Sequence, residues 1–109
     1  MTEFDVSKLF STSELHRRDI TACGMTFPVY FRRLPNGDVR RFHSEVTSED
    51  MEVRSRAGYA ALVKSARQED GTAFATHADY VKMDGEAVAA LMGAFTEIHA
   101  SKLEELGKS

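Results

Sequence analysis

The stretch ITACGMTFPVYF, residues 20–31, predicts two antiparallel β-strands. It is rich in aromatic and β-branched side chains, which pack well on a pleated sheet. Gly24 stands near its middle, where a residue that tolerates positive φ can close a tight turn. Pro28 has no backbone N–H, so we expect its strand to lie at a sheet edge or to be bulged at that point.

A second turn is predicted at residues 35–38, where Pro-Asn-Gly-Asp follows the apolar run. Proline presets φ at one turn position, and Asn-Gly supplies residues that adopt left-handed conformations. We therefore expect a second β-hairpin over residues 27–42, with arginines on both sides of its turn. Which of them point outward depends on the strand register, which the sequence leaves open. These arginines are Arg32, Arg33, Arg40 and Arg41.

Helices are predicted over most of the remaining chain. Residues 47–50, Thr-Ser-Glu-Asp, combine a hydroxyl N-cap with acidic residues in a first helical turn. Gly71 is the expected turning point after this unit, and Thr76 can cap a short helix through Met83. The last helix has one continuous apolar face, formed by Val88, Leu91, Met92, Phe95, Ile98 and His99.

These elements predict an α+β fold, in which a small N-terminal antiparallel β-hairpin or meander is followed by two to three helices packed on it. The chain length suits one domain with one core. We place this domain at residues 16–104, with a loosely ordered N-terminal arm over 1–15 and a flexible tail over 105–109. The predicted core consists of Val88, Leu91, Met92 and Phe95, joined by Phe74 and Tyr80.

Charge and composition narrow the class of protein. The formal net charge of -3 argues against a surface built throughout for nucleic acid, although residues 16–41 hold six arginines against two aspartates. The start of the chain has no basic and apolar leader, and no run approaches the ~20 apolar residues that span a bilayer, so we expect a cytoplasmic location. Cys23, the single cysteine, cannot form an internal disulfide, and we expect it to be a small buried residue.

No recognised catalytic or metal-binding motif is present. The four histidines are His16, His43, His77 and His99, and no two of them lie three or four residues apart. Such spacing is needed for two ligands on one helix face, so we expect no metal site. We expect His99 to lie near a helix C-terminus and to gain from its dipole. Phosphate loops, nucleophile elbows and dinucleotide fingerprints are also missing, so we expect neither an enzyme nor a cofactor.

The order of these features resembles the tail assembly chaperones of long-tailed bacteriophages. The resemblance covers the hairpin region at 27–42, the helix start at 47–50, the segment EDGTAFAT at 69–76 and the amphipathic helix at 85–100. It implies a protein without catalysis or cofactor that binds the extended, helical tape-measure protein during tail assembly. It also implies self-association along that partner and a place in the cytoplasm of the host cell.

These predictions leave three functions open, and the first of them is binding of a protein partner. For a protein partner, we expect helix faces together with the arginine hairpin to form the binding surface. The alternative function is a small nucleic-acid-binding regulator that uses the same hairpin, and a third is an adaptor protein of unrelated ancestry. Salt separates the first two, because phosphate binding releases counterions and weakens steeply with salt. The candidate partner-binding residues are Arg32, Arg33, Arg40, Arg41, Tyr59 and Tyr80.

Overall fold

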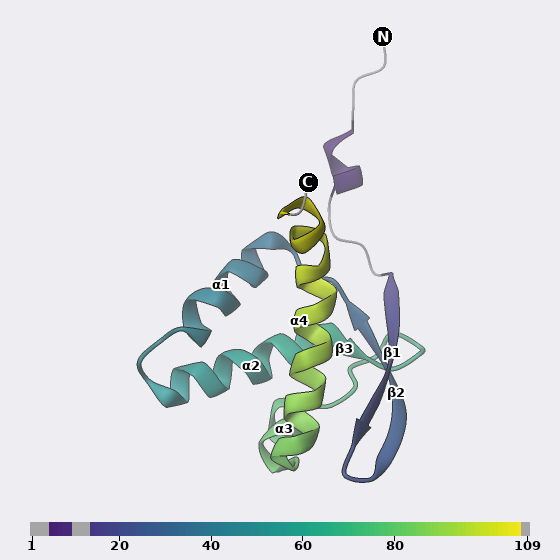
Figure 1. Ribbon diagram of the computed structural model, residues 1–109, viewed down its shortest axis with the longest axis vertical. Coiled ribbons are helices and arrows are strands. Elements are labelled where there is room, and N and C mark those ends of the chain that lie inside the picture. Colours follow the sequence, from purple (N-terminus) through teal and green to yellow (C-terminus); the bar gives the residue numbers. More distant parts are fainter. Residues whose placement is uncertain (1–4, 10–13, 108–109) are drawn as a thin grey trace.

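The computed structural model of the chain describes residues 5–9 and 14–107 (Figure 1). A three-stranded antiparallel sheet with strand order β1-β2-β3 is combined with helices, which confirms the predicted α+β class. The first two strands form the N-terminal hairpin, whereas the third is a two-residue strand that follows the second α-helix. The elements are η1 (Val6–Leu9), β1 (Leu15–Ala22), β2 (Met25–Arg32), α1 (Asn36–Val46), α2 (Met51–Ser65), β3 (Ala66–Arg67), α3 (His77–Lys82) and α4 (Gly85–Gly107).

The β1–β2 hairpin closes through two residues with positive φ. Ala22 pairs with Met25, and between them Cys23 has a φ of 55° and Gly24 a φ of 74°. These signs are those of a type I′ turn, whose twist matches the twist of the flanking strands. The predicted turn at Gly24 is therefore confirmed. The prediction that Cys23 is buried is wrong, because the turn places this residue at the exposed tip.

Pro28 occupies a position of β2 where the missing N–H costs no bond to β1. Counting by twos from the Ala22–Met25 pair, Pro28 and its partner Asp19 form a non-hydrogen-bonded pair. The nitrogen of Pro28 therefore faces away from β1. On that side β3 pairs only with Tyr30 and Phe31, so β2 is an edge at Pro28, as expected.

The predicted second hairpin is wrong, because residues 36–46 form α1. Pro35 occupies the N-cap position, and its carbonyl accepts from the amides of Asp38 at 3.0 Å and Val39 at 3.1 Å. Proline and Asn-Gly suit a helix start as well as a turn, and Asp38 adds a carboxylate to the first helical turn. Beyond the turn, Val39, Phe42 and Val46 recur with the period of a helix and not of a strand.

The predicted helix starts are close to the observed ones. The predicted hydroxyl N-cap of α2 is wrong, because Thr47 is the C-cap of α1. Asp50, the last residue of the predicted start, is the N-cap of α2, and its carboxylate accepts from the amide of Glu52 at 2.9 Å. Thr76 caps α3, as expected, through a reciprocal pair of bonds with Asp79. These caps satisfy backbone amides that have no partner inside the helix.

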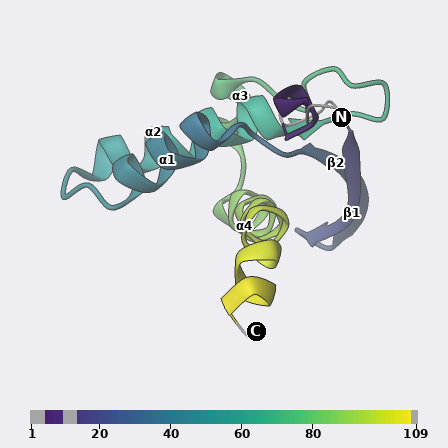
Figure 2. The same ribbon diagram turned by 90° about the horizontal axis from the view of Figure 1, so that it is seen from above.

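The core lies between the sheet, α2, α3 and α4. Tyr80, Leu91 and Phe95 are buried, as predicted, and Phe74, Val88 and Met92 pack around them while remaining half-buried. Figure 2 shows α1 and α2 side by side, with α4 beside this pair and the β1–β2 hairpin at the far end. Other large side chains that are fully buried are Val29, Phe31 and Leu62.

The two ends of the chain differ from the predicted arm and tail. In the predicted arm, residues 6–9 form η1, and Ser7 donates to the carboxylate of Asp5 through its amide and its hydroxyl. Residues 1–4 and 10–13 lie outside the described residues. At the other end α4 continues to Gly107, so the predicted flexible tail is helical over 105–107, and residues 108–109 lie outside the described residues.

Candidate functional site

The predicted arginine surface is divided between two elements. Arg32 ends β2 and Arg33 follows it, both half-buried, whereas Arg40 and Arg41 lie exposed on α1. The Nε atoms of Arg32 and Arg33 are buried and have no hydrogen-bond partner among the described residues. The expectation that these arginines share one β-hairpin is therefore wrong. Because α1 follows β2, these four arginines do not lie on a two-stranded ribbon that could enter a groove of nucleic acid.

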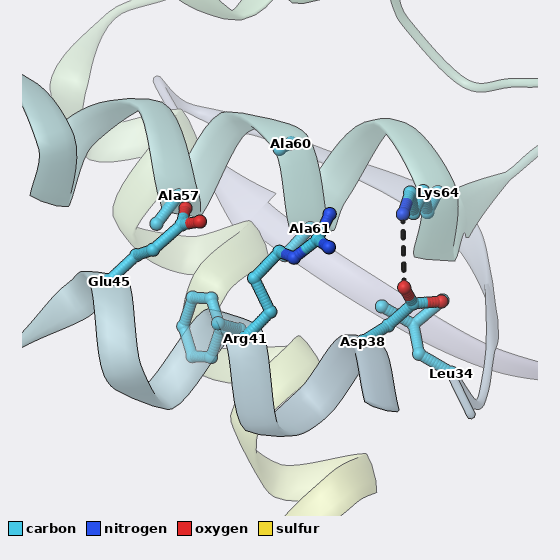
Figure 3. Close-up of a pocket in the computed structure, with 9 residues that line it drawn as sticks. Leu34, Asp38, Arg41, Glu45, Ala57, Ala60, Ala61 and Lys64 are labelled. Carbon is cyan, nitrogen blue, oxygen red and sulfur yellow. Dashed lines mark hydrogen bonds and ion pairs between the residues drawn. The ribbon is translucent and has the colours of Figure 1, made fainter. Parts of the chain in front are cut away.

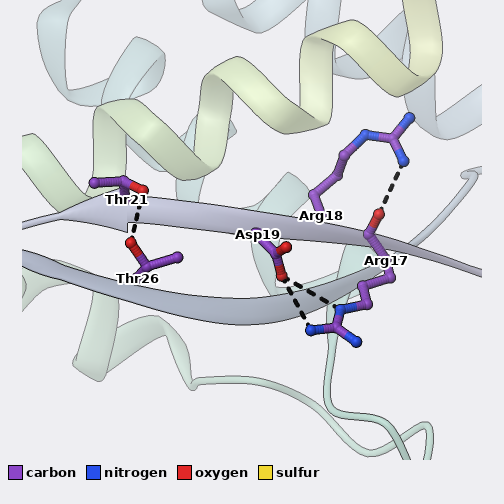
Figure 4. Close-up of polar contacts among 5 residues, drawn as sticks. All are labelled: Arg17, Arg18, Asp19, Thr21 and Thr26. Atoms are coloured by element: carbon purple, nitrogen blue, oxygen red, sulfur yellow. Dashed lines mark hydrogen bonds and ion pairs between the residues drawn. The ribbon is translucent and has the colours of Figure 1, made fainter.

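Two carboxylates, one at each face of β1, compensate part of its basic charge locally. Arg17 donates to Asp19 at 3.2 Å, and the hydroxyls of Thr21 and Thr26 bond across the strands at 2.9 Å (Figure 4). Arg18 donates to the carbonyl of Arg17 at 2.9 Å and lies 3.9 Å from Glu97 of α4. Two of the six arginines between residues 16 and 41 thus face carboxylates of this chain.

The two candidate tyrosines have different surroundings. Tyr80 is only 1% exposed, and its hydroxyl donates to the carbonyl of Leu62 at 3.4 Å. Burial raises its pKa to about 12. Tyr80 is therefore a core residue, and its assignment as a partner-binding residue is wrong. Tyr59 is half-buried on α2 and sets its ring edge-on to His77 of α3, with centroids 5.4 Å apart.

A crevice separates α1 from α2. Arg41 and Glu45 of α1 extend toward Ala57 and Ala61 of α2 (Figure 3), and the small alanines leave a volume of about 40 Å³. This volume holds one or two water molecules, whereas sites for small ligands occupy ~300 Å³ or more. At one end Lys64 bridges to Asp38 at 3.1 Å. The crevice is a packing feature between two helices that contact each other along small residues.

A wider hollow lies between β2 and the turn that follows β3. Its volume is about 360 Å³, and it is lined by Pro28, Tyr30, Gln68, Glu69 and Phe74. The ring of Phe74 stacks against Phe27 with centroids 6.2 Å apart. Of the lining residues only Glu69 carries a charge at neutral pH. The other polar side chains of the hollow are those of Tyr30 and Gln68, while Pro28 and Phe74 make the rest of its lining apolar.

Three potential metal ligands meet at the hairpin turn. Cys23, Asp84 and Glu86 each offer a ligand atom within 4.8 Å of the others, and all three residues are exposed. Each carboxylate already has a structural partner, since Glu86 accepts from the amide of Cys23 at 3.0 Å and Asp84 from that of Glu86 at 2.8 Å. Partial desolvation and both carboxylates raise the pKa of the Cys23 thiol. A thiol kept protonated is a poor ligand and a poor nucleophile.

Three of the four histidines lie in one region, which their sequence spacing did not predict. His99 of α4 accepts from the amide of Leu34 at 2.9 Å and bonds to the carbonyl of Phe95 at 2.8 Å. Burial lowers its pKa, and so do the positive charges of Arg33, His16 and His43. The predicted benefit from a helix C-terminus is wrong, since α4 continues beyond His99 to Gly107. Only the packing of α1, β1 and α4 brings these side chains together.

The comparisons with known proteins gave no match: no family model fits the chain, and no curated protein or solved structure is significantly similar to it. Among the described helices, none combines the length and the apolar character needed to cross a membrane.

Proposed function

We propose that this chain is a non-catalytic protein-binding module that chaperones an extended helical partner. The resemblance in the order of its motifs makes the tape-measure protein of a phage tail the proposed partner. The observation that carries the proposal is the exposed Met51 at the connection between α1 and α2, which is flanked by the half-buried Val46 and Val53 and lies apart from the core cluster. We call residues 46–53, which connect the helices α1 and α2, the hairpin tip; this tip is distinct from the turn of the β1–β2 hairpin. The tip offers an exposed apolar side chain to a partner.

The hairpin tip holds apolar side chains that the chain itself does not cover. Met51 is 69% exposed, and Val46 and Val53 are half-buried without joining the core cluster. Methionine adapts its shape to varied apolar surfaces, which suits a site that receives many segments of a long partner. Figure 1 places the connection between α1 and α2 at the end of the molecule far from the sheet, where a second protein has access.

Hydrogen bonds hold the hairpin tip in one conformation. The guanidinium of Arg54 donates to the carbonyl of Ser48 at 2.7 Å, and the hydroxyl of Thr47 donates to carbonyls of the last turn of α1 at 3.1 Å. The hydroxyl of Ser48 accepts from the amide of Asp50 at 3.1 Å. A preformed surface loses less conformational entropy on binding than a mobile one. Each copy of the chain can therefore bind the partner through a modest contact area. Many copies along one partner add avidity.

α1 supports the same surface. None of its residues is fully buried, although Val39 and Phe42 pack against the core from one side. Arg40 and Arg41 are exposed on this helix and add positive charge beside the tip. The tip itself carries the exposed carboxylates Glu49, Asp50 and Glu52. An amphipathic partner helix with acidic residues toward α1 and basic residues toward the tip matches a surface of this composition.

The alternative of a nucleic-acid-binding regulator loses its geometric basis. It required Arg32, Arg33, Arg40 and Arg41 on one two-stranded ribbon, and α1 replaces the second strand of that ribbon. If phosphate binding is nevertheless the function, affinity falls steeply with salt, whereas an apolar protein contact changes little. Titration of duplex DNA at two salt concentrations separates the two outcomes.

The test is co-expression with a tape-measure protein, followed by pull-down and light scattering. The wild-type chain is expected to keep the partner soluble in a complex with several copies of the chain. Met51→Asp is expected to lose this complex, because a carboxylate replaces the apolar contact. Met25→Asp is the matched control, since Met25 is also exposed, at 60%, but lies at the β1–β2 turn. Equal binding by both variants would move the partner surface away from the tip, and an insoluble partner beside the wild-type chain would reject the chaperone function.

A further inference from the structure

His99 connects two segments that are far apart in the sequence. Its Nε2 is 2.9 Å from the amide nitrogen of Leu34, 65 residues away, and its Nδ1 is 2.8 Å from the carbonyl oxygen of Phe95. A backbone amide only donates and a carbonyl only accepts. Nε2 must therefore carry a lone pair and Nδ1 must carry the proton. The two bonds together require the neutral imidazole in a single tautomer.

The position of Leu34 makes this bond a structural link between layers. Leu34 is 6% exposed and lies in the segment 33–35, which joins β2 to α1. Its bond to His99 ties this segment to α4. The ring of His99 also lies 4.2 Å from the ring of Phe95, whose other neighbour is Phe42 of α1 at 5.2 Å. His99 thus joins α4 to the linker, beside the Phe95 ring through which α4 contacts α1.

Burial lowers the pKa of His99 most, the hydrogen bond to the Phe95 carbonyl raises it, and electrostatic interactions with one arginine and two histidines lower it again. Arg33 comes from the linker, His16 from β1 and His43 from α1. On α4 itself the nearby carboxylate of Glu97 is already 3.9 Å from Arg18 of β1. A proton added to His99 would therefore meet like charges from three neighbouring segments inside a half-buried site.

We propose that His99 is a pH-sensitive latch, which holds the linker before α1 against α4 while it is neutral and releases it when Nε2 is protonated. A protonated Nε2 cannot accept from the amide of Leu34. The Nε2–H of His99 and the backbone N–H of Leu34 then point at each other and repel. The positive charge of Arg33 in the linker opposes reclosure. The latch lies at the root of the α1–α2 pair, so its release loosens the attachment of these helices to the rest of the domain. This inference does not depend on the identity of the partner.

The sign of the pH effect follows from the lowered pKa of His99. Because the folded state favours the neutral ring, the contribution of the latch is complete above the ordinary histidine pKa of ~6.5. It is lost as the pH falls from there through the pKa of His99 in the folded state. Between these two values the opening equilibrium rises by up to ~tenfold per pH unit, the slope of one proton, and then levels.

The experiment is hydrogen exchange of the Leu34 amide, resolved by NMR between pH 7.5 and pH 5 and corrected for intrinsic exchange. The wild-type chain is expected to lose protection at Leu34 over this range. In His99→Gln, which retains an acceptor but does not titrate, protection at Leu34 should be independent of pH. His77→Gln is the control, because His77 is an exposed histidine of α3 and should leave the wild-type profile unchanged.

A second readout keeps the proposal testable if His99→Gln does not fold. Nitrogen chemical shifts of the His99 ring should show a protonated Nδ1 and an unprotonated Nε2 at neutral pH. They should also give a midpoint below the ordinary histidine pKa of ~6.5. Unchanged protection of Leu34 at pH 5, or a His99 midpoint at or above ~6.5, would overturn the latch. So would a wild-type pH profile in a folded His99→Gln, which would assign the effect to His16 or His43.

Discussion

The hydroxyl of Ser65 donates a 2.8 Å hydrogen bond to the carbonyl of Arg32. Ser65 ends α2 and is fully buried, and Arg32 ends β2. The next residue, Ala66, pairs with Phe31 in the sheet. The bond therefore lies where the second helix joins the edge of the hairpin, and it satisfies a hydroxyl that has no access to water.

Ser65→Ala should lower the free energy of unfolding by about 1 kcal/mol, because it leaves the Arg32 carbonyl without this donor. Urea denaturation of the variant and the wild-type chain measures the difference. Ser55→Ala is the control on the same helix, since Ser55 is exposed and its loss should change little. Equal midpoints for wild type and Ser65→Ala would mean that water replaces the hydroxyl at the carbonyl.

Leu91→Ala should cost about 2 to 5 kcal/mol of stability, since it removes a fully buried side chain and leaves a cavity. Leu91 lies on the face of α4 that packs against the rest of the core. Val81→Ala, at a residue of α3 that is 58% exposed, should cost less than ~0.5 kcal/mol. Thermal or urea unfolding checks both. A loss below ~0.5 kcal/mol at Leu91 would be incompatible with a core position.

Stability at high pH should depend on Tyr80. Burial raises its pKa to about 12, whereas an unfolded chain ionises tyrosine near pH ~10. The folded state therefore retains the proton, so the contribution of Tyr80 is complete below pH ~10 and is lost as the pH rises toward its folded pKa. Urea midpoints from pH 9 to pH 11.5 should fall less steeply in Tyr80→Phe than in the wild-type chain. Tyr59→Phe, at a half-buried tyrosine, is the comparison and should keep the wild-type slope.

Cys23→Asn should raise the urea midpoint. Cys23 is held at a φ of 55°, where asparagine is favoured over most other residues, and Asn-Gly is the preferred pair for a type I′ turn. Cys23→Val should lower the midpoint, because a β-branched side chain is strained at positive φ. If both variants lower the midpoint equally, the side chain of Cys23 itself stabilises the turn, beside Glu86 and Asp84.

Local signals predicted an element correctly where a residue type strongly favours one conformation at its position. Gly24 predicted the tight turn of the β1–β2 hairpin, because few other residues adopt positive φ without strain. Thr76 predicted the start of α3, because its hydroxyl caps free amides only at a helix start. The period of apolar residues from Val88 predicted α4 and placed Leu91 and Phe95 in the core.

The candidate site was predicted less well than the fold. Arg40 and Arg41 were expected to be accessible, and they are, but on a helix instead of a strand. Tyr80 was expected both in the core and on the surface, and burial decides for the core. The uncovered Met51 gave a weak signal, because a methionine at a helix start suits packing and exposure equally well.

The sequence by itself determined the α+β class, the first hairpin, the cap of α3 and the apolar face of α4, because these elements rest on contacts between residues a few positions apart. Two local signals compete at residues 36–46, since the Pro-Asn-Gly start suits a turn and a helix alike, whereas the spacing of Val39, Phe42 and Val46 favours a helix. Distant partners stabilise the helix that forms, with Phe42 against Phe95 and Asp38 against Lys64. The same packing brings His99 to Leu34, since no local pattern encodes a hydrogen bond that spans 65 residues.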